Sequence, residues 1–175
     1  GKTRIFLDDV NNKSIINKIK NQNIVTYGFN QKSNFRIKNI KLLSNISIFD
    51  LEVNLPNQGK KIYKSFKIPL IGIHNIKNCS ASISVAIMMG ISINLIKKAI
   101  FEFKGVQRRF NYIFEHQQSI YYDDYAHHPT EIYELLRSIK TVYKSKKIIS
   151  VFQPHRISRV NYLKHRFTKC FKFSD

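Results

Sequence analysis

The chain has 175 residues, of which 43% are hydrophobic, so it can bury a core and disorder is not the default state. Lysine and arginine number 30 against 11 aspartate and glutamate residues, a formal net charge of +19. Because the excess is mostly lysine spread along the chain, we attribute it largely to composition bias, with a nucleic-acid-binding surface as the alternative. Two cysteines far apart in sequence fit neither a disulfide framework nor a zinc pattern, which favours a reducing cytoplasm.

One uncharged segment, Cys79 to Ile96, is long enough to raise the question of a membrane span. It contains several serines, Asn94 and the helix-breaking Gly90, so we expect two shorter helices of a soluble protein instead. The basic start of the chain reaches two aspartates before any long apolar run, so no signal peptide is expected.

The first part of the chain reads mainly as strands followed by helices. Apolar runs bounded by turn residues predict strands over 4–9, 23–29, 35–43, 46–55 and 62–70. Helices are predicted over 13–21, 74–89 and 92–103, with Gly90 ending the second helix and Ser92 capping the third.

The pattern changes after the segment 105–111, which we take as a boundary between two domains, 1–108 and 109–175. Short strands are predicted over 112–114 and 119–123, then a helix over 129–143, a near-continuous apolar strand in "KKIISVF" (146–152), and a last helix over 160–171. Such alternation is typical of an open α/β sheet, and the continuous apolar run is typical of a parallel strand covered on both faces. Neither domain looks complete.

Two strongly polar loops follow predicted strands of the second domain: "DDYAHHPTE" (123–131) and "QPHRISR" (153–159). In open α/β sheets, ligands collect at the carboxyl ends of the strands. If the two strands are neighbours, a cationic pocket for a carboxylate or phosphate would be formed by His127, His155, Arg156 and Arg159. The alternative is a pair of solvated loops that cap helices, for which Pro129 and Glu131 are ordinary choices.

Two other readings are disfavoured. A zinc site built from Asp123, Asp124, His127 and His128 lacks cysteine ligands and a spaced histidine pair on a helix, so no metal ligand is predicted. The opening "GKT" is not read as a phosphate-binding loop, because that loop needs glycines before the lysine and a helix after it.

The segment "GIHNIKNCSAS" (72–82) places Asn75 and Asn78 three residues apart, on one face of a helix start. Two side-chain amides there could recognise the edge of a base. The alternative is that asparagine is simply tolerated near a helix N-terminus. In "GVQRRF", Arg108 or Arg109 could reach a phosphate near the domain boundary.

Together the segments resemble the Mur ligases, the ATP-dependent amino-acid ligases of peptidoglycan precursor synthesis. "TYGF", "GIHNIKNCSASISVA", "GVQRRF", "YYDDYAHHPTEI" and "FQPHRISR" occur in the family's order and approximate spacing, and they cover essentially the whole chain. The resemblance is nearest to the member that joins L-alanine to UDP-N-acetylmuramate, with another amino-acid or peptide ligase of the family as the alternative. Ser158 stands where threonine is usual, which keeps the hydroxyl.

The resemblance implies an α/β fold: the later part of a P-loop-type ATPase central domain (1–108) followed by the start of a Rossmann-like C-terminal domain (109–175). The domain that holds the uridine nucleotide, the glycine-rich phosphate loop and the expected magnesium ligands are not among the matched segments. We therefore expect this chain to be a fragment that is inactive alone.

The resemblance also implies residue roles, an activity and partners. Adenine contacts fall on Asn75 and Asn78, nucleotide phosphate and ribose contacts on Arg109 and Asp124, and the reacting carboxylate and amino acid on His127, Arg156 and Arg159. The implied reaction uses ATP and Mg2+ to convert the muramate carboxylate to an acyl phosphate, which the amine of L-alanine then attacks. The implied partners are therefore small molecules of the cytoplasm, UDP-N-acetylmuramate and L-alanine, with no nucleic acid and no membrane.

Overall fold

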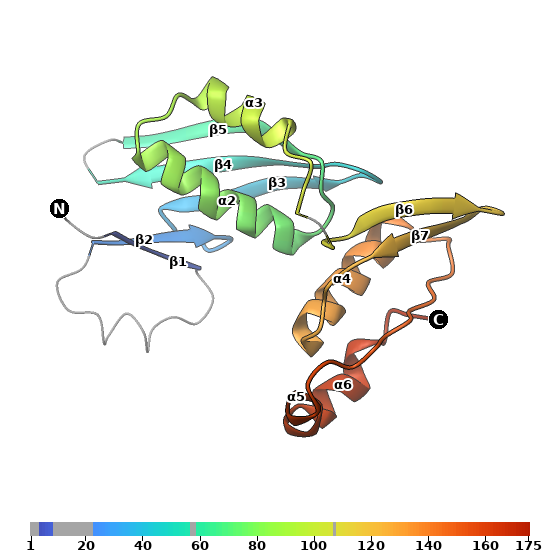
Figure 1. The fold of residues 1–175 in the computed structure, drawn as a ribbon. Helices are drawn as coiled ribbons and strands as arrows, with labels where there is room; N and C mark the ends of the chain where they lie inside the picture. The colour runs from blue at the N-terminus through green and yellow to red at the C-terminus, as the bar shows by residue number, and fades with distance from the viewer. Residues whose placement is uncertain (1–3, 9–22, 57–58, 107) are drawn as a thin grey trace.

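The computed structural model describes residues 4–8, 23–56, 59–106 and 108–175. They form two units joined by a short connection (Figure 1): a five-stranded sheet covered by two helices, and a two-stranded hairpin beside three helices. The helix predicted over 13–21 and the opening "GKT" lie outside the described residues.

The sheet of the first unit is mixed. Its strands, in spatial order, are β1 (Arg4–Asp8), β2 (Asn23–Gly28), β3 (Phe35–Leu42), β4 (Ser47–Leu55) and β5 (Gly59–Ile68). The pairs β1–β2 and β2–β3 are parallel, whereas β3–β4 and β4–β5 are antiparallel. All five strands predicted for this part of the chain are confirmed, with ends that differ by a few residues.

The core of the first unit follows from alternation along the strands. On β4, Phe49, Leu51, Val53 and Leu55 are buried, and Phe49 stacks on Phe66 of β5 at 5.5 Å. Helices α2 (Ile73–Met88) and α3 (Ile93–Phe101) cover this face through residues that include Ile76, Ile83 and Ile96. Each fully buried side chain of this size stabilises the fold by about 1.5–3 kcal/mol.

The opposite face of the sheet carries a buried carboxylate held by three cations. Glu52 on β4 lies 3.1 Å from Lys60, 3.2 Å from Lys38 and 3.9 Å from Arg36. The hydrogen bond from Lys60 is the largest influence that keeps the pKa of Glu52 below its ordinary value. Part of the chain's positive charge therefore pairs with a buried carboxylate of its own fold.

The segment from Cys79 to Ile96 forms parts of two helices, as expected. Gly90, with φ of +79°, follows the C-cap of α2 and allows the chain to leave the helix. Ser92 occupies the N-cap position of α3, although its side chain makes no cap hydrogen bond. No helix in the described ranges is both long and apolar enough to cross a membrane.

The second unit begins with an antiparallel hairpin, β6 (Asn111–His116) and β7 (Ser119–Asp123). Gln117 and Gln118 both have positive φ, which suits a tight two-residue turn. Helices α4 (Pro129–Val142), α5 (Ile157–Tyr162) and α6 (Lys164–Cys170) follow. Its small core joins α4 to α6 and is centred on Ile132, Leu136, Ile148 and Cys170.

The strand predicted over 146–152 is wrong. Ile148 is buried and bonds through its backbone to Asp175, but Ile149 and Val151 are 76% and 98% exposed. Strands β6 and β7 pair with each other, and within the described residues no strand lies beside this segment to complete a ladder. In place of the open sheet with a parallel strand expected here, the second unit has an antiparallel hairpin and no strand over 146–152. The single helix predicted over 160–171 is instead two helices. Helix α5 begins at Ile157, and Leu163 is both its C-cap and the N-cap of α6.

Candidate functional site

Asp124 joins the connection between the units to the loop after β7. Its Oδ2 accepts a hydrogen bond from the backbone N–H of Phe110 at 2.7 Å, and its Oδ1 accepts one from Ala126 at 2.6 Å. The N–H of Tyr125 donates to the carbonyl oxygen of Arg108 at 2.7 Å. Burial raises the pKa of Asp124, and the N–H donors of Ala126 and Phe110 together with Arg109 oppose that rise. The segments "GVQRRF" and "DDYAHHP" are thus held as one structure.

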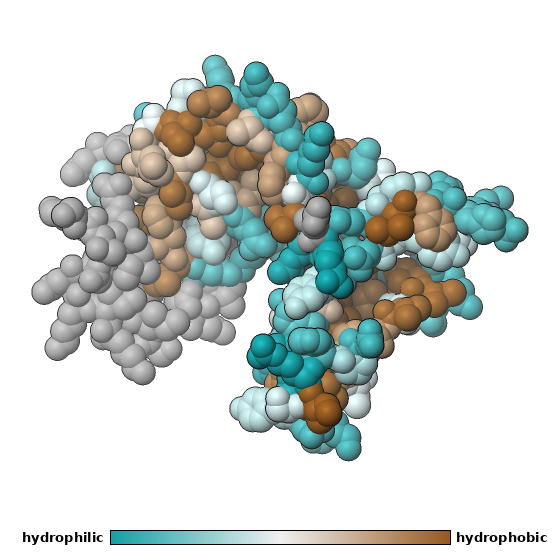
Figure 2. Space-filling model, viewed as in Figure 1, coloured by the Kyte–Doolittle hydropathy of each residue, from teal (hydrophilic) through white to brown (hydrophobic). Residues whose placement is uncertain are grey.

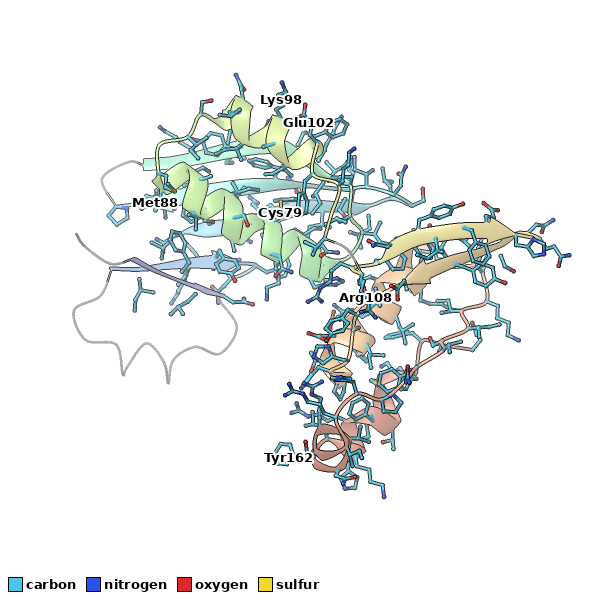
Figure 3. All side chains as sticks on the ribbon, viewed as in Figure 1. Cys79, Met88, Lys98, Glu102, Arg108 and Tyr162 are labelled. Atoms are coloured by element: carbon cyan, nitrogen blue, oxygen red, sulfur yellow. The ribbon has the colours of Figure 1, made fainter. Side chains whose placement is uncertain are left out.

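Arg109 is presented from a strained turn. The residues on either side of it, Arg108 and Phe110, have φ of +59° and +51°, which non-glycine residues seldom adopt. Arg108 lies 3.7 Å from the Asp123 carboxylate and over the ring of Tyr125. Figure 3 shows Arg108 at the junction of the two units, so its exposed neighbour Arg109 is at this junction as well.

His74 enters the same junction from the first turn of α2. A Cβ added at Gly72 would lie 2.8 Å from Cε1 of His74 and 3.0 Å from Oγ of Ser138, so the imidazole folds back over Gly72 against α4. Its Nδ1 is buried and has no hydrogen-bond partner. Burial lowers the pKa of His74, while the carboxylates of Asp124, Glu134 and Glu131 act in the opposite direction.

Sequence reasoning missed His74. Its neighbour Asn75 was singled out, but nothing local in the sequence indicates that α2 packs on α4. The only available signal was the position of a histidine beside that asparagine in a polar helix start.

The two predicted adenine contacts lie on the first two turns of α2. The Nδ2 of Asn75 donates to the carbonyl oxygen of Ile71 at 2.9 Å, which fixes the amide and leaves Oδ1 as an acceptor. Asn78 is exposed one turn later. Both residues therefore start from the end of α2 that faces the second unit.

The ring of His127 is held by its own loop. Its Nδ1 lies 2.9 Å from the carbonyl oxygen of Tyr125, and because a carbonyl only accepts, Nδ1 is the donor in this hydrogen bond. The ring packs edge-on against Tyr125, and Nδ1 is 3.8 Å from Oε2 of Glu131. In the neutral ring, Nε2 is then the nitrogen that can accept a hydrogen bond.

The capping alternative is also confirmed for this loop. His128 is the N-cap of α4 and accepts the N–H of Thr130 at 3.2 Å, while Glu131 accepts the N–H groups of His127 and His128. This is a capping box in which histidine takes the usual place of serine or threonine. Pro129 is buried at the first helical position.

The arginines of "QPHRISR" open helix α5. Arg156 has φ of +68° and ψ of 102°, a strained conformation for a residue with a side chain. Nη1 of Arg159 is buried and has no hydrogen-bond partner, and an unsatisfied buried donor costs about 1–3 kcal/mol. An acceptor from a ligand would remove that cost.

The expected convergence of the two polar loops rested on two neighbouring strands, of which β7 is formed and the one predicted over 146–152 is not. Among the residues that the structure describes, no hydrogen bond or ion pair joins His127 to His155, Arg156 or Arg159. Figure 1 nevertheless places α5 at the same end of the second unit as the start of α4. The loops share one end of the unit without direct polar contact.

The surface between the units is notched, and Figure 2 shows hydrophilic residues at its apex. A separate shallow cavity of about 380 Å³ is lined by Tyr162, Leu163, His165 and Arg166, none of which was predicted as a site residue. The described part of the chain contains no group of three or more His, Cys, Asp or Glu residues that could hold a metal ion.

Comparison with known proteins places both units in one family. Residues 2–86 match the model of the Mur ligase middle domain, and residues 108–171 match the Mur ligase, glutamate ligase domain. The chain is 53% identical over its full length to a UDP-N-acetylmuramate–L-alanine ligase of Pelagibacter ubique, of which it covers 38%. It is 38% identical to the protein of that name from Sinorhizobium medicae, covering 98% of this chain and 36% of the relative.

A solved structure agrees with these matches. The UDP-N-acetylmuramate–alanine ligase of Thermotoga maritima superimposes with a TM-score of 0.71 at 30% identity, over 86% of this chain and 32% of that protein. The chain thus spans little more than a third of the length of the relatives it matches. The two domain matches lie in the family's order, one relative matches over the whole of this chain, and a solved member shares its fold. This chain therefore belongs to the Mur ligase family.

Proposed function

We propose that this chain is part of an ATP-dependent ligase that joins L-alanine to UDP-N-acetylmuramate, a step of peptidoglycan precursor synthesis. The observation that carries the proposal is the full-length 53% identity to a relative of that name. The geometry supports it, since Asp124 locks two polar loops together at the junction where the start of α2 meets the second unit. The chain would divide into 1–108, from the ATP-binding domain, and 109–175, from the ligase domain.

The nucleotide side of the site is assigned to the junction. Asn75 and Asn78 would contact adenine from the first turns of α2, Arg109 would approach the phosphates, and Asp124 would lie on the ribose side. Two features support this assignment: Asn78 and Arg109 are exposed, and the amide of Asn75 is held in one orientation by Ile71. Asp124 already accepts two backbone N–H groups, so its contact with a ribose would use a remaining lone pair.

The amino-acid side is assigned to α5 and to the loop before α4. A planar guanidinium presents two parallel donors to a carboxylate, and Arg159 has a buried N–H group without a partner. Arg156 and Arg159 would therefore hold the carboxylate of L-alanine. His127 would present Nε2 near the reacting groups, as an acceptor for a proton of the attacking amine.

ATP would supply the phosphoryl group that activates the muramate carboxylate. This chain would then contribute positive charge from Arg109 beside the transferred group, where fixed cations stabilise developing negative charge. Closure of the notch between the units would exclude water, which competes with the amine for an activated carboxyl. We assign no magnesium ligand to the described residues, because they contain no suitable cluster.

The test is an assay of the complete protein for ADP release. We expect release to require both UDP-N-acetylmuramate and L-alanine, with D-alanine, glycine and a peptide as comparison substrates. Release that depends on another amino acid or on a peptide instead would support a different ligase of the family and overturn this proposal. ADP release without any amine, measured in the same assay, would report hydrolysis of the activated carboxyl by water.

A further inference from the structure

The two units touch through a chain of hydroxyl groups at the C-terminal end of α4. Tyr143, the C-cap of α4, places its hydroxyl 3.2 Å from the carbonyl oxygen of Ser44, in the turn between β3 and β4. The same hydroxyl lies 3.0 Å from the hydroxyl of Tyr122 on β7. Tyr143 thus bonds both to its own unit and to the first unit, 99 residues away in sequence.

The direction of these bonds is fixed by the atoms involved. A carbonyl oxygen has no proton, so Tyr143 must donate to Ser44. A tyrosine has a single hydroxyl proton, so Tyr143 can only accept from Tyr122, and Tyr122 is the donor. The resulting order is Tyr122 to Tyr143 to Ser44, in which the first bond supports the second by polarising the hydroxyl between them.

A second contact lies further back along the same helix. Ser138 is buried, and its side chain packs beside Gly72 and His74 at the start of α2. Tyr143 is five positions after Ser138, which corresponds to about 7.5 Å along a helix axis. One contact alone would leave α4 able to rotate about it, whereas two contacts on one rigid helix also fix its angle to the first unit.

We propose that the Tyr122–Tyr143–Ser44 chain is an interdomain clasp, which sets the angle of the second unit while the α2–α4 contact serves as its pivot. The clasp goes beyond the proposed function and does not depend on which amino acid the enzyme uses. Its consequence for that function is positional, because the angle of α4 sets the distance from the start of α2 to the loop that carries His127.

Three phenylalanine substitutions separate the clasp from general packing, since each keeps the ring. Tyr143→Phe removes both hydrogen bonds, Tyr122→Phe removes one, and Tyr121→Phe is the matched control. Tyr121 lies next to Tyr122 on β7, is exposed, stacks on Phe114, and its hydroxyl takes part in no hydrogen bond to another described residue.

The angle can be measured as a distance between spin labels in the complete protein without ligand. Lys61→Cys on β5 and Ser119→Cys at the start of β7 put one label on each unit at exposed positions. The two cysteines of this chain should label slowly, because burial raises the pKa of Cys79 to about 12 and also raises that of Cys170. Labelling of the parent protein without the two new cysteines gives the background.

We expect one main distance for the parent and for Tyr121→Phe. In Tyr143→Phe the fraction of molecules outside that distance should rise about two- to tenfold, the factor that a lost hydrogen bond corresponds to, and Tyr122→Phe should be intermediate. If Tyr143→Phe and the parent give the same distribution, the clasp is refuted. An equal change in Tyr121→Phe would also refute it, because the effect would then not be specific to the hydroxyl groups of the clasp. ADP release measured on the same samples reports the proposed function separately.

Discussion

The carboxylate of Asp124 accepts the backbone N–H of Phe110 at 2.7 Å, a bond that ties the connection between the units to the loop that opens α4. This relationship gives Asp124 a structural task in addition to the ribose contact proposed for it. The bond and its partner at Ala126 hold both loops in place before any ligand arrives.

Asp124→Asn should destabilise the protein because an amide presents an acceptor to one of the two N–H groups and a donor to the other. Hydrogen bonds to charged groups contribute about 1.5–3 kcal/mol. The burial that raises the pKa of Asp124 offsets part of this contribution, so we expect a loss below about 3 kcal/mol in the free energy of unfolding by urea. Asp123→Asn is the control, because Asp123 makes a solvent-exposed ion pair with Arg108 at 3.7 Å, worth about 0–1 kcal/mol. Equal losses in the two variants would contradict the claim that the hydrogen bonds of Asp124 hold the two loops together.

Gly72→Ala should destabilise the contact between α2 and α4. Gly72 has φ of +108°, and an added Cβ would approach His74 to 2.8 Å and Ser138 to 3.0 Å. Gly59 is the matched control, since it also has positive φ, +67°, but no atom lies within 4 Å of its added Cβ. Both variants include the backbone cost of about 1–3 kcal/mol, so thermal unfolding should show a larger loss for Gly72→Ala. If the two losses are the same, the imidazole does not press on Gly72.

The pH dependence of stability should carry a contribution from His74. Burial holds its pKa in the folded protein below the ordinary value of 6.5, against the opposing carboxylates of Asp124, Glu134 and Glu131 and with the support of Arg109. Below pH 6.5, therefore, His74 is protonated in the unfolded chain but is protonated less in the folded protein. Stability is fully present above that pH and is lost as the pH falls through it.

The measurement is urea unfolding of the parent and of His74→Phe between pH 5 and pH 8. The difference in unfolding free energy between the two should shift in favour of His74→Phe as the pH falls, since phenylalanine binds no proton. His155→Phe, at an exposed position, controls for loss of any histidine. A constant difference between the parent and His74→Phe across this range would contradict the burial of a neutral imidazole.

The sequence predicted the elements whose signals are local. The alternation on β4, the Gly90 stop after α2 and the Pro129–Glu131 start of α4 each reflect forces within a few residues of chain. The apolar run over 146–152 shows where this reasoning fails. Apolar residues favour burial, but a strand also needs a neighbour to complete its hydrogen bonds, and the sequence of one segment does not contain that information.

The candidate site divides in the same way. The loop around Asp124 and His127 was found because its polar residues are adjacent in sequence. His74 and the Tyr143 hydroxyl were missed because their roles depend on contacts between segments that are far apart in the chain. Arg156 and Arg159 remain assigned by resemblance, with the strained backbone of one and the unpartnered N–H of the other as structural support.

The proposed function places the nucleotide and the amino acid on two separate walls of the notch between the units. The most direct measurement is the KM of the complete enzyme for ATP and for L-alanine in two variants, Asn78→Ala and Arg159→Ala, with Arg166→Ala as a control outside the proposed site. Loss of a hydrogen bond to a charged group, such as the carboxylate of L-alanine, corresponds to about a tenfold or larger change, and loss of one to a neutral base to about a two- to tenfold change. We predict that Asn78→Ala raises the KM for ATP, that Arg159→Ala raises the KM for L-alanine, and that Arg166→Ala changes neither. Two variants that raise both KM values equally would contradict the division of the notch into these walls.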